Sequence, residues 1–454
     1  MIRITTALAL VLALTACKGD APSASKEVSP DGHAYTLIHM GGIDDVAIEI
    51  AWPSDWAYRD DVNLATPYVG TQVILSGGAE GYPAAEVGER FADMESEAYL
   101  TARTTDHIYG ELLYLKEHSD ETMQIANAHL RAPAMDQLWI DRASNELGQN
   151  LTASLAQPAN RGFEAVRWAV LGDQPLRRSQ DAGGPESVKA VTRADILDWM
   201  QAVLTSQPEA ITVTGDVTAA EAGKALDTLL EGLPAPDHEV SRPVTADFSP
   251  RRILLHIPEA ETTQLGFVGQ LPPSREGGEF EDMILANALG GSDQSVLFEA
   301  VRSQLRASYG FGTGIANYNR DLRIFVMTGA VEADKLAEAE TVLREAYAGF
   351  VADGLSGDLS DHKAPFLASV EENIGYVDSN GLAELENILD GGETGRVLRM
   401  KAEVEAITTQ SITDRLQSAF PAPDQLITIA VSPDRDALPG ACVIETPAEA
   451  MDCP

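Results

Sequence analysis

The sequence predicts an α+β fold built from two homologous α/β-sandwich domains that arose by internal duplication. Two observations support this prediction before any element is assigned. About 420 residues remain after the N-terminal leader and tether, which is enough chain for two hydrophobic cores. A polar segment containing several prolines, residues 233–252, divides that length nearly in half and has the composition of an interdomain linker. The predicted domains are therefore residues 35–232 and 253–454.

The two halves begin with the same pattern, which is the third observation. VAIEIAWPSDW (46–56) alternates like a strand and leads into a helical pattern that begins near Asp61. TQLGFVGQLPPSRE (263–276) does the same and leads into a helix at 279–291. The repetition of one strand and helix order predicts the duplication of a single α+β unit.

Each half then continues with helices and closes on a segment rich in β-formers. Long helical patterns occupy residues 136–155 and 333–354. The closing segments are AITVTGDVTAAEAG (210–223) and LITIAVSPDRDAL (426–438), each a strand pattern followed by an acidic, turn-forming stretch. The similarity is one of pattern, not of identity.

The first residues predict export. MIRITTALALVLALTAC (1–17) has a basic start, an apolar centre and small residues before Cys17, as in a secretory signal peptide. Leu14–Cys17 also resembles a bacterial lipobox, which predicts lipidation of Cys17; an ordinary cleaved signal with an incidental cysteine is the alternative. Polar residues 18–34 then form a flexible tether, and Lys18 favours the outer membrane. We expect a lipid-anchored protein on the periplasmic side of the cell envelope.

The other two cysteines lie close together in the C-terminal tail. Cys442 and Cys453 are eleven positions apart. In an oxidising compartment this spacing favours a disulfide that pins the tail. A two-cysteine metal site is the alternative, and no histidine lies near the pair in the sequence.

The charge balance excludes several partners. The chain has 32 basic and 70 acidic residues, a formal net charge of −38. This balance argues against binding to nucleic acid or to anionic membrane surfaces. The charge is also compatible with a solubility strategy or a salty habitat. No segment after the leader approaches the apolar length of a membrane span.

The second half contains the most specific motif. ANALGGSDQSVLFEAVRSQLRASYGFGTG (286–314) resembles the C-terminal domain of the insulinase/pitrilysin family of zinc peptidases. The match includes the Leu-Gly-Gly turn, a Ser-x-Leu-Phe helix start, and an arginine and a tyrosine seven positions apart, Arg302 and Tyr309. The resemblance implies two domains facing each other across a cavity, with the arginine–tyrosine pair contacting the substrate near the scissile bond. A guanidinium suits a peptide carbonyl, and a phenol can donate to a developing oxyanion. Without the surrounding motif, a solvated arginine and a half-buried tyrosine would be the better interpretation.

The first half departs from the family where the metal should be bound. The family carries H-x-x-E-H on a helix after the first strand, in which two histidines bind zinc and the glutamate is the general base. With AYLTARTTDHIYG (98–110) fixing the register, the three positions fall on Tyr68, Thr71 and Gln72. The family's later glutamate falls near Gly148 or Gln149; Glu146 is close but is turned away from that helix face. We therefore expect no zinc and no other cofactor in this chain.

Other catalytic arrangements find little support in the sequence. His107, His118 and His129 recur at intervals of eleven, but they lie on a strand-like run and at both ends of one helical pattern, so they cannot meet at one ion. Solvated or capping histidines are the better interpretation. GGSDQS (290–295) follows a helical pattern instead of a strand, which argues against a phosphate loop.

Some members of the family work as heterodimers in which one subunit keeps zinc and the other keeps the arginine–tyrosine pair. The resemblance therefore implies a non-catalytic, substrate-binding subunit of a heterodimeric periplasmic zinc peptidase, with a zinc-binding paralogue as partner and a peptide as substrate. Arg302 and Tyr309 would complete the partner's active site. The strand near Tyr99–Thr105 is either an edge that a peptide extends or an ordinary internal strand. The alternative function is an envelope peptide-binding or structural lipoprotein with no role in proteolysis.

Overall fold

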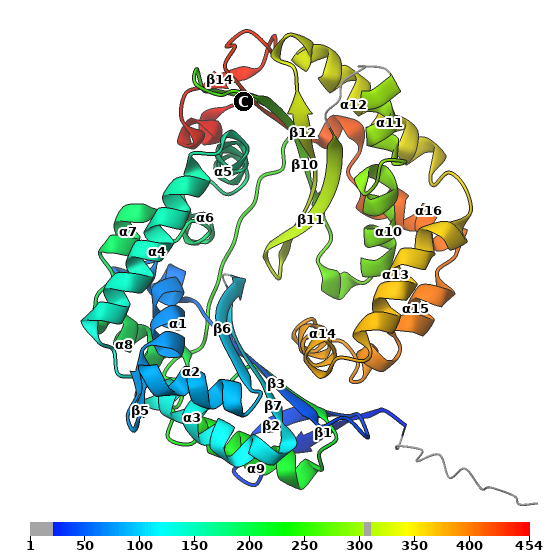
Figure 1. Ribbon diagram of the computed structural model, residues 1–454. Coiled ribbons are helices and arrows are strands. Elements are labelled where there is room, and N and C mark those ends of the chain that lie inside the picture. The colour runs from blue at the N-terminus through cyan, green and yellow to red at the C-terminus, as the bar shows by residue number, and fades with distance from the viewer. Residues whose placement is uncertain (1–20, 105, 304–309) are drawn as a thin grey trace, which may run out of the picture.

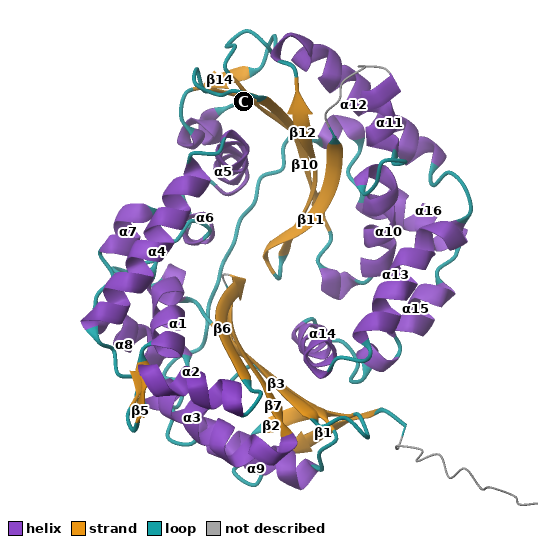
Figure 2. Cartoon of the chain, in the orientation of Figure 1, coloured by secondary structure: helices purple, strands orange, loops and turns teal. Residues whose placement is uncertain are grey.

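The computed structural model describes residues 21–104, 106–303 and 310–454 (Figure 1). These residues form two large mixed sheets, one in each half of the chain, with helices packed around them (Figure 2). The predicted fold class, α+β with two α/β domains, is confirmed. The predicted lipidation site, Cys17, lies outside the described residues. Within the described ranges, no helix is both long enough and apolar enough to cross a bilayer.

The N-terminal sheet has the strand order β1-β2-β8-β3-β7-β6. Its strands are β1 (Ser23–Val28), β2 (Ala34–His39), β3 (Asp45–Pro53), β6 (Glu97–Thr104), β7 (His107–Leu115) and β8 (Ala210–Gly215). The helices of this half are α1 (Thr66–Ser76), α2 (Ala84–Asp93), α3 (Ser119–Arg131), α4 (Gln137–Leu155), α5 (Pro158–Leu171), α6 (Pro175–Ser179), α7 (Pro185–Lys189), α8 (Arg193–Val203) and α9 (Ala219–Leu230). A small hairpin, β4 (Gly78–Ala79) and β5 (Tyr82–Pro83), joins α1 to α2.

The C-terminal sheet has the order β11-β12-β10-β13-β9-β14. Its strands are β9 (Arg252–His256), β10 (Thr263–Leu271), β11 (Phe311–Asn319), β12 (Leu322–Val331), β13 (Ile427–Ser432) and β14 (Cys442–Ile444). The helices are α10 (Glu279–Gly290), α11 (Val296–Ser303), α12 (Leu336–Asp353), α13 (Leu359–Asn373), α14 (Val377–Leu389), α15 (Met400–Ala406) and α16 (Thr409–Ala419).

The strand pairings repeat between the halves, as duplication requires. In the first sheet β2 runs parallel to β8, and β8, β3, β7 and β6 follow as antiparallel neighbours. In the second sheet β9 runs parallel to β13, and β13, β10, β12 and β11 follow in the same way. Only the additional outer strands differ, because β1 is antiparallel to β2 whereas β14 is parallel to β9.

The halves exchange one helix each. Helix α5 of the first half packs on the C-terminal sheet, where Ala165 and Val166 share a buried core with Ile253 and Val268. Helix α14 of the second half packs on β3 and β8 of the N-terminal sheet, where Leu385 is fully buried. Figure 1 shows α5 beside the upper sheet and α14 beside the lower one. Each sheet is therefore completed by a helix from the other half.

A glycine at the equivalent place in each exchanged helix explains the close packing. A Cβ at Gly162 of α5 would lie 2.9 Å from Val431, and a Cβ at Gly381 of α14 would lie 3.0 Å from Glu49. The side chain of Thr212 donates to the carbonyl of Gly381 across 3.0 Å. These contacts cover the inner face of β3, so this strand is buried on both faces and its Glu49 is 1% exposed.

Several boundaries differ from the sequence-based expectations. The first helix begins at Thr66 and not near Asp61. Residues 98–110 form two strands, β6 and β7, instead of one. The acidic stretch at the end of 210–223 begins α9, because Thr218 and Glu221 form a capping box.

Part of the predicted tether is also ordered structure. Residues 23–28 form β1, which pairs with β2 at the edge of the N-terminal sheet. An edge strand can be held by main-chain hydrogen bonds alone, so the polar side chains of SASKEV (23–28) remain largely exposed. For this reason the strand has the composition of a linker. Residues 233–251 connect α9 to β9 without helix or strand and run between the sheets (Figure 1). This connection is anchored, for example by the amide of Asp247, which donates to the carbonyl of Val170 across 2.8 Å.

Cys442 and Cys453 are joined by a disulfide, with 5.8 Å between their Cα atoms. The bond closes β14 and the following short helix into a loop. Cys453 and Ala450 are buried in the same core as α5. The tail is therefore part of the contact between the two halves of the chain.

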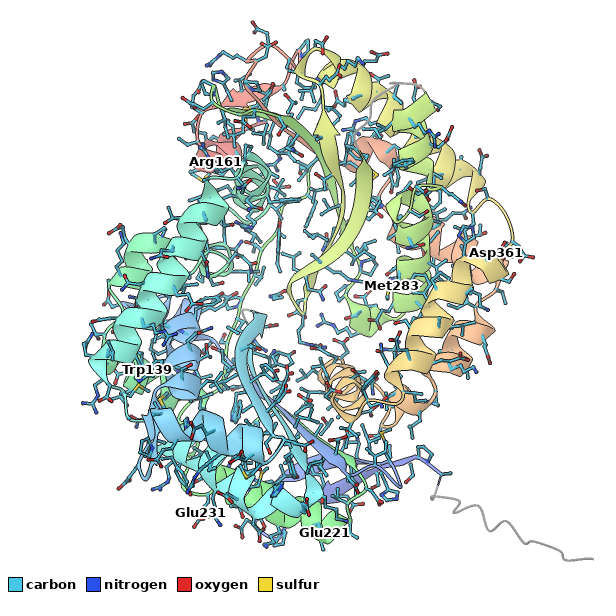
Figure 3. All side chains as sticks on the ribbon, viewed as in Figure 1. Trp139, Arg161, Glu221, Glu231, Met283 and Asp361 are labelled. Carbon is cyan, nitrogen blue, oxygen red and sulfur yellow. A yellow bond between two sulfur atoms is a disulfide. The ribbon has the colours of Figure 1, made fainter. Side chains whose placement is uncertain are left out.

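Acidic side chains lie on the outer surface of both domains. Glu221 and Glu231 lie at the outer end of the N-terminal domain, and Asp361 lies on the outer side of the C-terminal helices (Figure 3). All three are exposed. Such a distribution keeps a chain with a large net negative charge soluble.

Candidate functional site

Helix α1 places the three positions of the expected metal motif on neighbouring turns. Tyr68 is half-buried, and its phenol donates to the carbonyl of Ser179 across 2.9 Å. Thr71 is buried, and its hydroxyl donates to the carbonyl of Tyr68 across 3.2 Å. Gln72 is exposed. Two of the three side chains are thus engaged in hydrogen bonds within the N-terminal domain.

These side chains do not fit the zinc ion that the family fold implies. Burial, reinforced by the nearby Asp181 carboxylate, raises the pKa of Tyr68 to about 12, so the phenolate needed for metal binding is disfavoured. A threonine hydroxyl cannot replace a carboxylate as general base, and the neutral amide of Gln72 is a weak ligand. Among the described residues, no group of three or more histidine, cysteine, aspartate or glutamate side chains is arranged to hold a metal.

The position of the later family glutamate is also unsuited to a metal. Helix α4 packs against α1, and Gly148 is buried in it while Gln149 is exposed. Glu146 is exposed to solvent. The structure therefore offers a buried glycine or a neutral amide where the family resemblance implies a carboxylate ligand.

Arg302 lies in the last turn of α11 and is exposed. Tyr309 lies outside the described residues. Helix α11 packs against α10, α12 and β11, all in the C-terminal half, whereas α1 packs against α3, α4, α8 and β6 of the N-terminal half. The arginine and the helix of the degenerate metal motif therefore belong to different domains.

The strand near Tyr99 is an edge strand. In the N-terminal sheet β6 pairs with β7 on one side and ends the sheet on the other. Leu100 is buried, and Tyr99 is 51% exposed on the opposite face. Its hydroxyl donates to the carboxylate of Glu97 across 2.6 Å. The strand is therefore not an internal one, and its pairing with a peptide stays a prediction.

The three evenly spaced histidines occupy different environments. Their interpretation as solvated or capping residues is wrong for two of them. His107 on β7 is 0% exposed, and His129 on α3 is 7% exposed. Only His118, half-buried immediately before α3, occupies a helix-capping position. Burial of the other two follows from the strand and helix faces on which they lie, which the spacing alone did not reveal.

His107 belongs to a polar junction between the domains that sequence reasoning missed. Its Nε2 lies 2.9 Å from Glu209 Oε2, and its Nδ1 lies 3.5 Å from Asp106 Oδ1. Asp106 precedes β7, and its Oδ2 accepts a hydrogen bond from the main-chain amide of Arg320, 3.0 Å away in the β11–β12 turn. The guanidinium of Arg320 binds Glu386 and Asp390 at the end of α14. These residues come from four distant parts of the sequence.

Comparison with known protein families gives a match for part of this chain. Residues 190–361 match the protein family described as the peptidase M16 inactive domain. The matched segment includes Arg302 and most of the C-terminal sheet. The resemblance to the insulinase peptidases predicted from the sequence is therefore confirmed for this part of the chain. No curated protein matches the sequence.

Solved structures extend the resemblance to the fold of the whole chain. A peptidase M16 inactive domain from Pseudomonas fluorescens has a TM-score of 0.75 at 13% identity, covering 90% of this chain and 98% of that one. A protease from Helicobacter pylori has a TM-score of 0.74 at 10% identity, covering 91% and 100%. The periplasmic protease PqqL from Escherichia coli has a TM-score of 0.68 at 16% identity, and the match covers 96% of this chain and 50% of PqqL. At these identities the likeness shows a shared two-domain fold.

Proposed function

We propose that this chain is the non-catalytic, substrate-binding subunit of a heterodimeric zinc peptidase in the bacterial cell envelope. The observation that carries the proposal is the contrast between α1 and α11. Helix α1 has Tyr68, Thr71 and Gln72 in place of zinc ligands and a base, and Tyr68 is engaged with Ser179. Helix α11 retains Arg302, exposed at its end.

Each part of the chain has a role in this proposal. A zinc-binding paralogue supplies the metal and the general base. Arg302 and Tyr309 contact the peptide near the bond that is cut, where a guanidinium and a phenol stabilise developing negative charge. The open edge of β6 pairs with the extended peptide through main-chain hydrogen bonds.

The envelope location rests on three supports. The leader at residues 1–17 has the pattern of a lipoprotein signal, and the disulfide between Cys442 and Cys453 suits an oxidising compartment. One of the structures with the same fold is described as a periplasmic protease. We propose lipid attachment at Cys17 and an outer-membrane anchor facing the periplasm.

The proposal is tested by assaying the purified chain on an unfolded peptide, alone and with a zinc-binding paralogue from the same organism. We expect no cleavage by the chain alone and zinc-dependent cleavage by the pair, faster than by the paralogue alone. Zinc-dependent cleavage by the isolated chain would overturn the proposal.

The second candidate is an envelope peptide-binding protein with no role in proteolysis. The polar junction centred on Arg320 favours it, because this junction ties the two domains of one chain together without a partner. The same assay separates the candidates. Peptide binding by the isolated chain, with no gain in cleavage by the paralogue, would support the second.

A further inference from the structure

The N-terminal domain contains an apolar cavity between its sheet and the helices that cover the outer face of the sheet. Its volume is about 480 Å³, and it lies between the outer face of β3, β6 and β7 and the helices α1, α2 and α3. Figure 1 shows these helices on the side of the sheet opposite α14. Apolar side chains dominate the wall, including Ile48, Ile50, Ile74, Phe91, Leu100 and Leu130. The volume falls in the range of about 300–1,000 Å³ typical of ligand sites.

Helix α2 covers this cavity, and of its apolar residues Phe91 packs against the domain core. Ala84, Val87, Gly88 and Phe91 line the cavity and recur at helical spacing, so they form one face of α2. None of the residues of α2 is buried, although the helix is amphipathic. A Cβ at Gly88 would meet no atom within 4 Å. A face of this kind is normally buried against core side chains, whereas here Ala84, Val87 and Phe91 are only half-buried.

One residue of the wall, His129, has a buried polar atom without a hydrogen-bond partner. His129 lines the cavity and is 7% exposed. Its Nδ1 lies 2.6 Å from the carbonyl of Ile74, so Nδ1 carries the proton and donates it. Its Nε2 is buried and has no hydrogen-bond partner. Burial lowers the pKa of His129, which keeps the ring neutral and leaves Nε2 as an acceptor.

The charges on the wall define the ligand further. Glu97 and Glu111 contribute to the lining, and no lysine or arginine is found among the described residues that form it. An anionic head group would therefore be repelled.

We propose that this cavity binds a neutral amphiphile with one aliphatic chain and a hydroxyl group that donates a hydrogen bond to His129 Nε2. The chain lies against the aliphatic face of β3 and β6 and is covered by α2. The ligand restores the contacts that the apolar face of α2 lacks and partners the buried nitrogen. This site lies on the outer face of the sheet, so it is independent of the proposed role of Arg302.

The test uses the full chain and radiolabelled 1-decanol in equilibrium dialysis. We expect saturable binding of one decanol per chain. Methyl decyl ether has a similar chain and no donor, so it should compete about tenfold more weakly, as the loss of one buried hydrogen bond implies. Decanoate should also compete poorly above its pKa.

Two glycine variants locate the binding. Gly88→Leu fills the cavity and should weaken decanol binding at least about tenfold. Gly349→Leu is the matched control, because Gly349 is also a helical glycine with no atom within 4 Å of its Cβ and lies in α12 of the other domain. It should bind decanol as the wild type does. Val87→Phe provides a second filling variant if circular dichroism shows that Gly88→Leu does not fold.

Three results would overturn the inference. They are the absence of saturable decanol binding by the wild type, undiminished binding by a folded filling variant, and equal competition by the alcohol and the ether. Binding of an apolar peptide in competition with decanol would instead assign the cavity to a peptide side chain, and would also overturn the proposed ligand class.

Discussion

The main-chain amide of Arg320 donates a hydrogen bond to the carboxylate of Asp106 across 3.0 Å, and this contact joins the β11–β12 turn to the residue before β7. Because these elements belong to different sheets, the contact fixes one domain against the other. The guanidinium of Arg320 extends the junction to α14 through Glu386 and Asp390. The side chain of Arg320 is 11% exposed, so its interactions are only weakly screened by solvent.

Arg320→Ala is expected to lower the free energy of unfolding by about 2–3 kcal/mol, because it removes charge-assisted hydrogen bonds and leaves Glu386 and Asp390 uncompensated. Arg275→Ala is the matched control. Arg275 pairs with Asp321 nearby, but both side chains are about half exposed, so a loss below about 1 kcal/mol is expected. Urea unfolding measures both changes. Equal losses in the two variants would show that the junction does not depend on Arg320.

His107 gives the chain a predicted pH dependence. Burial alone would lower the pKa of His107, but the Asp106 and Glu209 carboxylates outweigh burial, so the pKa is raised. A group whose pKa is raised in the folded state stabilises that state. The stabilisation is complete below the pKa of the unfolded state, about 6.5, and is lost as the pH rises through the pKa of the folded state. The wild type should therefore lose stability relative to His107→Gln as pH rises from about 6 upward.

Urea unfolding at several pH values from 5.5 to 8.5 measures this difference. The hydrogen bond to His107 lowers the pKa of Glu209, so this carboxylate remains ionised across the range and does not obscure the effect. Parallel stability curves for the wild type and His107→Gln would contradict the prediction.

Replacing two glycines in neighbouring helices by alanine should change the stability of the chain in opposite directions. Gly88→Ala in α2 is expected to stabilise the chain by about 0.5–1 kcal/mol, because the helix gains propensity and the new methyl meets no atom within 4 Å. In Gly70→Ala on α1 the methyl would lie 2.8 Å from the buried ring of Trp199. Overpacking of about 1–3 kcal/mol should then exceed the gain in propensity. Thermal unfolding of the two variants distinguishes them, and a higher melting temperature for Gly70→Ala would refute the packing at this contact.

The disulfide in the tail is expected to stabilise the chain by about 3 kcal/mol, the value that loop closure gives for a short loop. The double variant Cys442→Ala and Cys453→Ala should lose that amount in urea unfolding, and dithiothreitol should no longer affect it. Because Cys453 packs in the core that contains α5, protease sensitivity near α5 should rise as well. A loss below about 1 kcal/mol would show that packing alone holds the tail.

Local patterns were sufficient to predict the repeated framework. The β3 and β10 strands, the helices that follow them and the long helices α4 and α12 are encoded by periodicity and by turn residues near each other in the sequence. The presence of α1 was predicted from the helical pattern that follows β3, although its first residue was misplaced when the helix was expected to begin near Asp61. These features depend on short-range chemistry.

Long-range features could not be predicted in the same way. The exchange of α5 and α14 between the sheets, and the meeting of Asp106 with Arg320, depend on how the halves pack. Gly162 and Gly381 were the available sequence signal for the exchange, because each occupies the same place in its helix. However, a glycine within a helix does not show which element packs against it. Strand β1 was missed since an edge strand needs no apolar pattern.

The candidate site was predicted from motif positions, and the structure adds the hydrogen-bond partners of the side chains at those positions. Sequence alone placed Tyr68, Thr71 and Gln72 on one helix, and the structure adds that Tyr68 is bonded to Ser179. The cavity beneath α2 was not predicted, because an amphipathic helix over a cavity and one over a packed core have the same sequence pattern.

The central claim is tested most directly by kcat/KM for peptide cleavage by the complex of this chain with its zinc-binding paralogue. Arg302→Ala in this chain should reduce kcat/KM about 100-fold, the usual effect of removing a group that stabilises the transition state, while the zinc content of the complex stays the same. Arg193→Ala, which changes another exposed arginine on α8, is the control and should have no effect. An Arg302→Ala complex that assembles, retains zinc and cleaves the peptide at the wild-type rate would contradict the account.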